Sequence, residues 1–141
     1  SFALFAVGKI HDPAVREALP EVIGSLMHPD KEVRDSAARA LGKIAETVPA
    51  TQLGEERRVE ILEALFRALS DVQPAVRAKA VRSLGKLVRA AYLHPAQQER
   101  VRLAVLRILG QDEAHEWDRA FIVRREAEEA LRHLDDRAQT T

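Results

Sequence analysis

Residues 30–48, with the sequence DKEVRDSAARALGKIAETV, decide the fold of this chain. Their apolar residues recur at helical spacing and form one stripe, while charged residues occupy the opposite side. The stripe consists of Val33, Ala37, Leu41 and Ile44. This pattern predicts an amphipathic helix that buries one face. Asp30 stands directly before it, and its carboxylate can accept a hydrogen bond from the free N–H groups of the first turn.

The chain repeats this helix pattern. Residues 74–88, PAVRAKAVRSLGKLV, match it in register through a shared Leu-Gly-Lys segment. Residues 3–10, ALFAVGKI, match its second half, and residues 122–134, IVRREAEEALRHL, form a weaker copy. The aligned leucines are 43 and 47 residues apart, at Leu41, Leu84 and Leu131. Such spacing is typical of α-solenoids, in which a helix pair buries its apolar face only by stacking on its neighbours.

Alignment of the copies divides the chain into repeats. Residues 1–11 are expected to form the second helix of a truncated repeat, which makes the chain a fragment of a longer protein. Three helix pairs are expected to follow, at residues 12–50, 51–93 and 94–134. Within them we expect a linker at residues 51–54, a helix from Pro74 to Leu93 and an inserted turn at residues 110–121. Residues 135–141 are expected to be a polar tail that frays.

Composition restricts the functional classes. The 141 residues are 46% hydrophobic and 31% charged, which is enough for one domain with its own core. The absence of cysteine excludes disulfides, thiolate chemistry and a cysteine-based zinc site. No apolar run reaches the length of a membrane span, and no signal-like segment is visible. We therefore expect a cytoplasmic domain without membrane contact.

The turns within the helix pairs resemble those of HEAT repeats, which typically carry an aspartate and, six residues later, an arginine. Asp71 with Arg77, and Asp118 with Arg124, match this pattern. The resemblance implies an all-α, right-handed superhelix of antiparallel helix pairs, with about seven helices. It also implies that these residues pair between neighbouring repeats in a buried Asp–Arg ladder. His28 stands where the first complete repeat would have its aspartate, which leaves that rung open.

Charge is unevenly distributed along this neutral chain. Residues 72–109 contain eight Lys or Arg and one acid, a charge of +7, and the remainder carries −7. Lys79, Arg82, Lys86 and Arg89 are spaced to form one stripe on a helix. The equivalent stripe is milder in the preceding repeat, at Arg39 and Lys43, and acidic in the last, at Glu126 and Glu129. The resemblance implies that such second helices line a concave face.

Two interpretations of the basic stripe remain open. It is either a solvated helix face or a groove that receives an acidic segment of a partner protein, with charge setting encounter rate and register. Trp117, the only tryptophan, is predicted to lie on the inserted turn as a second contact point. The alternative is that Trp117 folds back, with Phe121, over the end of the stack.

Catalytic constellations are missing from the sequence. There is no glycine-rich phosphate loop, no serine-centred elbow and no metal-ligand spacing, since His115 and Glu116 are merely adjacent. We expect a non-enzymatic scaffold that binds protein, without metal or cofactor.

Three alternatives to an acidic protein partner carry weight. The segment GKIHDPAVREALPEVI, residues 8–23, is similar to the HEAT subgroup named for bilin lyases. That similarity implies an accessory subunit whose basic stripe holds the propionates of a tetrapyrrole. A nucleic-acid-binding module is disfavoured by the acidic end of the groove and by the single tryptophan and single tyrosine. Self-association through an open N-terminal end at Phe2 and Phe5 is the third alternative.

Overall fold

The computed structural model describes residues 12–140, and all regular structure in this range is helical. Seven helices follow one another in this range. They are α2 (Asp12–Ser25), α3 (Lys31–Thr47), α4 (Ala50–Leu53), α5 (Glu55–Ala68), α6 (Pro74–Arg89), α7 (Pro95–Ile108) and α8 (Phe121–Thr140). The helix expected at residues 1–11 and the association surface at Phe2 and Phe5 lie outside the described residues.

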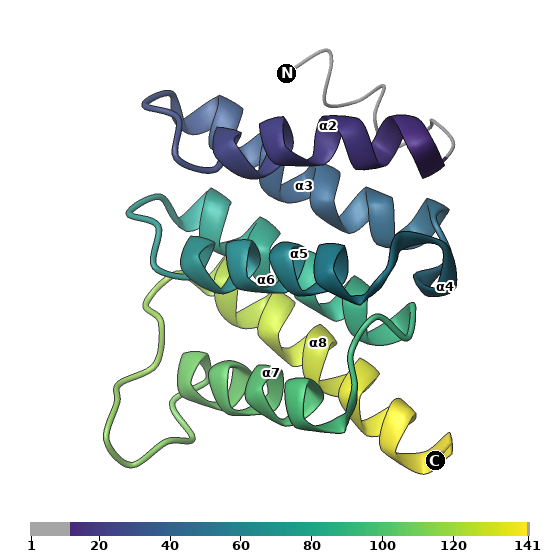
Figure 1. The fold of residues 1–141 in the computed structure, drawn as a ribbon. Helices are drawn as coiled ribbons and strands as arrows, with labels where there is room; N and C mark the ends of the chain where they lie inside the picture. Colours follow the sequence, from purple (N-terminus) through teal and green to yellow (C-terminus); the bar gives the residue numbers. More distant parts are fainter. Residues whose placement is uncertain (1–11, 141) are drawn as a thin grey trace.

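The helices form two layers (Figure 1). The first helices of the three pairs, α2, α5 and α7, lie one above another, and the second helices, α3, α6 and α8, stack behind them. Each pair is antiparallel and rests on the next pair. The predicted all-α solenoid of stacked helix pairs is therefore confirmed. None of the helices in the described part of the chain combines the length and apolarity that crossing a bilayer requires.

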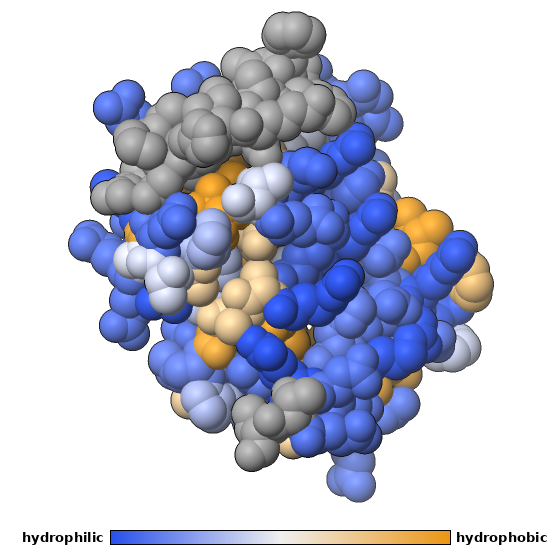
Figure 2. All heavy atoms as spheres, turned by 90° about the vertical axis from the view of Figure 1, so that its right-hand side faces the viewer, coloured by the Kyte–Doolittle hydropathy of each residue, from blue (hydrophilic) through white to orange (hydrophobic). Residues whose placement is uncertain are grey.

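The core runs continuously between the two layers. Leu41 and Ile44 of α3, Leu65 of α5, and Leu87 of α6 are fully buried. Outside this core, the face shown in Figure 2 is mostly hydrophilic, with separate apolar areas between charged side chains. Asp30 caps α3 as predicted, because its carboxylate accepts a hydrogen bond of 2.8 Å from the N–H of Glu32.

Helix α6 ends at Arg89, four residues before the predicted end at Leu93. Ala91 adopts a positive φ of 60°, which turns the chain so that the N–H of Tyr92 donates back to the carbonyl of Leu87. The buried Tyr92 hydroxyl then donates to the carbonyl of Val48, at 2.6 Å. This anchor to the preceding repeat holds residues 90–93 off the helix axis.

Two further segments differ from the sequence-based prediction. Residues 50–53 form the short helix α4 instead of a linker, and its Leu53 is buried in the core. Residues 135–140 continue α8 instead of forming an irregular tail. There the carboxylate of Asp135 accepts a hydrogen bond from Arg102 of α7, which ties the end of α8 to its partner helix.

Glycine allows the second helices to approach closely. A Cβ on Gly42 of α3 would lie 2.5 Å from Ser83 Oγ of α6, and one on Gly85 would lie 3.2 Å from His133 Cδ2 of α8. The Ser83 hydroxyl donates to the carbonyl of Ala38 at 2.7 Å, so this buried polar group is satisfied. The repeated Leu-Gly-Lys segment is therefore a packing feature of the α3–α6–α8 layer.

We predict that Gly42→Ala lowers the free energy of unfolding by about 1–3 kcal/mol, because the new methyl group overlaps Ser83. Urea denaturation measures the change. Gly24→Ala is the matched control: its Cβ would have no atom within 4 Å, and alanine favours the helix by up to about 1 kcal/mol. Equal effects of the two substitutions would contradict the close approach of α3 and α6.

Candidate functional site

The three intra-repeat turns share one hydrogen-bond pattern. The side chain of the first turn residue accepts from the N–H group two residues later, at 2.9–3.0 Å. These acceptors are His28 Nδ1, Asp71 Oδ1 and Asp118 Oδ1. The arginine six residues later donates its Nη1 to the backbone carbonyl of the same first residue, at 2.8–2.9 Å. These arginines are Arg34, Arg77 and Arg124. Each arginine is thereby fixed over its own turn.

Arg34 and Arg77 also reach forward to the next repeat. Arg34 Nε lies 2.8 Å from Asp71 Oδ2, and its Nη2 lies 3.2 Å from Asp71 Oδ1. Arg77 meets Asp118 in the same way, at 2.8 and 3.1 Å. Both contacts are bidentate, and the carboxylates are only 9% and 14% exposed. Asp71 and Arg77 therefore do not bond side chain to side chain; each bonds to a neighbouring repeat.

The surroundings keep both aspartates ionised. Burial by itself would raise the pKa of Asp71, but the hydrogen bonds from Arg34 and from the turn N–H outweigh it, so the pKa lies below its ordinary value. The pKa of Asp118 is lowered by the same balance, with Arg77 as its partner. The hydrogen bond to Asp71 raises the pKa of Arg34 in turn.

His28 replaces only one of the two functions of aspartate. Its Nδ1 accepts the turn N–H of Asp30, at 3.0 Å, so the turn is satisfied. It carries no carboxylate that could accept from an arginine of another repeat. The Arg34–Asp71 contact is unaffected, because it uses the aspartate of the following repeat.

The structure divides the predicted basic groove into two groups of cations. Lys79 Nζ lies 3.3 Å from Asp35 Oδ2, and Lys86 Nζ lies 3.1 Å from Glu46 Oε1, so both lysines join α6 to α3. The other four arginine and lysine side chains of the stripe are exposed. These are Arg39, Lys43, Arg82 and Arg89.

A hollow of about 580 Å³ lies between α6 and α8, and we call it the α6–α8 hollow. Its lining includes basic residues of both helices together with three acids. The basic residues are Arg82, Lys86, Arg89, Arg125 and Arg132, and the acids are Glu46, Glu126 and Glu129. Lys86 and Arg132 are ion-paired to Glu46 and Glu129. Among the described residues, no carboxylate lies within ion-pair distance of Arg82, Arg89 or Arg125.

His133 lines the same hollow and lies against Gly85. Burial lowers its pKa by more than the carboxylate of Glu129, 3.6 Å from Nε2, raises it. The imidazole is therefore neutral at pH 7, and the positive charge of the hollow comes from its arginines and lysine.

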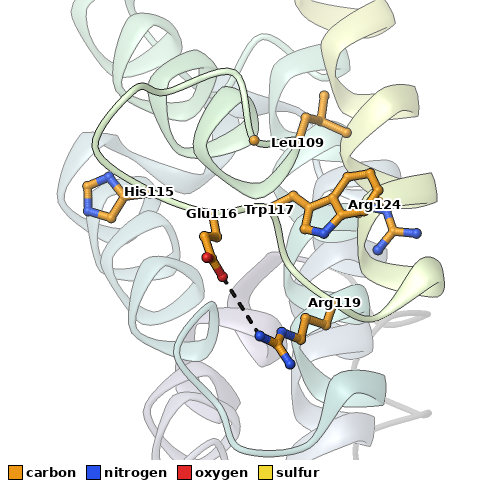
Figure 3. A pocket seen from close by; sticks show the side chains of 7 residues that line it. Leu109, His115, Glu116, Trp117, Arg119 and Arg124 are labelled. Atoms are coloured by element: carbon orange, nitrogen blue, oxygen red, sulfur yellow. Dashed lines mark ion pairs between the residues drawn. The ribbon is translucent and has the colours of Figure 1, made fainter.

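Trp117 lies on the inserted turn, beside Arg124 (Figure 3). The guanidinium carbon of Arg124 lies 4.2 Å from the centre of the Trp117 ring and 5.9 Å from that of Phe121. The N–H of Asp118 donates to the carbonyl of Ile108, which holds the insertion against the end of α7. Trp117 nevertheless remains 57% exposed. It folds onto Arg124 and still presents a large aromatic surface to solvent.

Two family models match the sequence. One is described as a HEAT-like repeat and covers residues 2–44, and the other as a HEAT repeat and covers residues 61–91. Together they span about half of the chain, and within the described residues they overlap the pair α2–α3 and the pair α5–α6. The chain belongs to the HEAT-repeat family. HEAT repeats generally mediate protein interactions.

A solved structure agrees with this HEAT-repeat fold. It is the crystal structure of an engineered protein determined by the Northeast Structural Genomics Consortium, with 20% sequence identity and a TM-score of 0.62. The match covers 94% of this chain and 53% of the other, so this chain spans about half the length of that protein. At this identity the similarity concerns the fold alone. No match was found among curated protein sequences.

Two residues of this HEAT-repeat chain make contacts or line a hollow in the structure but were not among the residues predicted from the sequence. Arg34 bonds to Asp71, and its signal was present, because it follows His28 by six residues as Arg77 follows Asp71. Arg125 lines the α6–α8 hollow. The sequence indicates this position only through its spacing, which puts Arg125 on one helix face with Glu129 and Arg132. Among the described residues, no group of three or more histidine, cysteine, aspartate or glutamate side chains has metal-binding geometry.

We predict that the Arg–Asp contacts make stability pH-dependent below pH 5. The folded pKa values of Asp71 and Asp118 lie below the ordinary value of about 4, so the unfolded chain takes up protons first as pH falls. The contribution is therefore complete above pH 5 and is lost as pH falls through the folded pKa values. Urea denaturation between pH 7 and 2.5 measures it.

The Asp71→Asn/Asp118→Asn variant is the control. It should be less stable at pH 7 and lose less stability on acidification than the wild type. Parallel curves for the two proteins would contradict the assignment of the acid sensitivity to these carboxylates.

Proposed function

We propose that this HEAT-repeat chain is a non-catalytic scaffold and that its α6–α8 hollow binds an acidic segment of a partner protein. The observation that carries the proposal is the group of three exposed arginines at the hollow, Arg82, Arg89 and Arg125, with no carboxylate within ion-pair distance among the described residues. Each presents a planar guanidinium whose donors match the two oxygens of a carboxylate.

Two lysines of the basic stripe are already ion-paired within the chain, so the proposed binding site includes fewer residues than the whole stripe. Lys79 and Lys86 already bind Asp35 and Glu46, so a partner's carboxylates would have to compete with these contacts. Arg39 and Lys43 of α3 are exposed and extend the positive surface beyond the hollow. The site therefore favours an acidic segment that runs along α6 and contacts the arginines more than the lysines.

The acids of the hollow favour a peptide over nucleic acid. Glu126 and Glu129 lie beside Arg125 and Arg89, so a continuous phosphate backbone would pass close to negative charge. A peptide can place its acidic residues opposite the arginines and neutral residues opposite the glutamates. A tetrapyrrole with two propionates would need only two of the three arginines, and it remains the second candidate.

The test is binding of fluorescein-labelled peptides of about ten residues that differ in the number and spacing of their acids. Fluorescence anisotropy should show saturable binding of some acidic peptides to the wild type. Arg82→Glu/Arg89→Glu/Arg125→Glu should weaken it by at least tenfold, a loss of about 1.4 kcal/mol. The matched control is Lys31→Glu/Arg67→Glu/Arg107→Glu, which makes the same change in net charge at exposed positions outside the hollow.

The control should keep most of the binding. If both variants lose it equally, the binding depends on net charge and not on the hollow. If no acidic peptide binds while an oligonucleotide does, the nucleic-acid alternative replaces the proposal. Visible absorbance acquired on incubation with a bilin, and lost in the hollow variant, would favour the tetrapyrrole.

A further inference from the structure

The described residues that line the α6–α8 hollow give it a net positive charge. Five basic side chains and three carboxylates leave a net charge of +2, and the imidazole of His133 is neutral at pH 7. A phosphate monoester carries about −1.5 to −2 charges at this pH, on three acceptor oxygens. We propose, on the basis of the function proposed above, that the partner segment carries a phosphorylated serine or threonine whose phosphate binds Arg82, Arg89 and Arg125.

The turns of this protein show how an arginine binds a single carboxylate. Arg34 donates to both side-chain oxygens of Asp71. Arg77 donates to both side-chain oxygens of Asp118. One guanidinium thus engages both oxygens of a carboxylate, whereas the three terminal oxygens of a phosphate can accept from two or three guanidinium groups. Three exposed arginines around one hollow therefore favour a phosphate over a single carboxylate.

The three arginines reach the hollow from two helices. Arg82 and Arg89 lie two turns apart on one side of α6, with α-carbons about 10 Å apart, and Arg125 comes from α8. Gly85 lies between the first two, where a Cβ would approach His133 Cδ2 to 3.2 Å. Because Gly85 has no side chain, the floor of the hollow stays open at this point. The long arginine side chains, exposed on both helices, can therefore meet one anion there.

The acids of the hollow restrict it to one phosphate. Glu126 and Glu129 belong to its lining. Glu129 accepts a hydrogen bond of 2.9 Å from Arg132 Nε, and this bond lowers the pKa of Glu129, so the carboxylate stays ionised at neutral pH. A second phosphate, or a continuous phosphate backbone, would lie beside these negative charges. The hollow therefore fits an isolated phosphate in an otherwise neutral segment better than a polyphosphate or a nucleic acid.

The uncharged part of the hollow is small. Among the described residues that line it, only Gly85, Ala130 and His133 carry no charge at pH 7. A phosphotyrosine would bring a phenyl ring, which gains affinity by packing against apolar or aromatic side chains. This lining offers such a ring little to pack against. It therefore favours the short side chains of phosphoserine and phosphothreonine.

The test compares four fluorescein-labelled peptides of about ten residues with identical neutral flanks. The central residue is phosphoserine in the first, serine in the second and glutamate in the third. The fourth has two adjacent glutamates, which match the charge of the phosphate. Fluorescence anisotropy with the complete chain should show the phosphoserine peptide binding at least about tenfold more tightly than either glutamate peptide. The serine peptide should show no saturable binding.

Substitutions at the hollow test which side chains hold the phosphate. Arg82→Gln, Arg89→Gln and Arg125→Gln should each weaken phosphoserine binding about fivefold or more and reduce its preference over two glutamates. Arg125→Lys keeps the charge but loses the planar fork of donors, so it should also reduce the preference. Arg107→Gln is the matched control, because it removes the same charge at an exposed position outside the hollow and should change neither quantity. Circular dichroism checks that helicity is unchanged.

Three results would overturn the inference and leave the proposed function standing. The first is equal affinity for the phosphoserine and two-glutamate peptides. The second is a phosphoserine preference that persists in Arg82→Gln/Arg89→Gln/Arg125→Gln. The third is displacement by inorganic phosphate at the same concentration as by unlabelled phosphoserine peptide, since the hollow would then recognise the free anion. If none of the anionic peptides binds, the inference and the proposed function both fail.

Discussion

The structure depends on a bidentate contact between an arginine of one repeat and an aspartate of the next. Arg77 and Asp118 lie 41 residues apart in sequence, yet both are also hydrogen-bonded to backbone groups of their own turns. Removing two charges from water is costly, and the cost is offset only when the remaining donors and acceptors are satisfied. Here they are satisfied. Each contact therefore fixes which turn of one repeat packs against which turn of the next, while the stacked apolar faces supply most of the stability.

Close packing of the second helices is the other constraint, and it shapes the binding surface. Gly42 and Gly85 bring α3, α6 and α8 together, so side chains that point out of this layer come to lie side by side. Some of them become ion pairs between repeats, as Lys86 does with Glu46. Others, such as Arg82 and Arg89, are left with exposed donors around the α6–α8 hollow. The packing that stabilises the solenoid thus places some cations in ion pairs between repeats and leaves others exposed around the hollow.

The helices and their turn residues were predictable from sequence because the repeats carry local signals. Asp30 as a cap and Asp71 and Asp118 as first turn residues are examples of such signals. The contacts of Lys79 and Lys86 were not predictable, since their acids belong to α3 and lie 44 and 40 residues earlier. The end of α6 depends on Tyr92 reaching Val48, and the end of α8 depends on Asp135 meeting Arg102. Each miss reflects a contact between segments distant in sequence.

The most direct test of this account is a double-mutant cycle on the contact between Arg77 and Asp118. Urea denaturation of the wild type, Arg77→Gln, Asp118→Asn and the double variant should give a coupling energy of at least about 1 kcal/mol. The exposed pair Arg57 and Glu60, within one helix, is the control and should give less than about 0.5 kcal/mol. Additive effects at Arg77 and Asp118 would show that the stacking register does not depend on the Arg–Asp contacts.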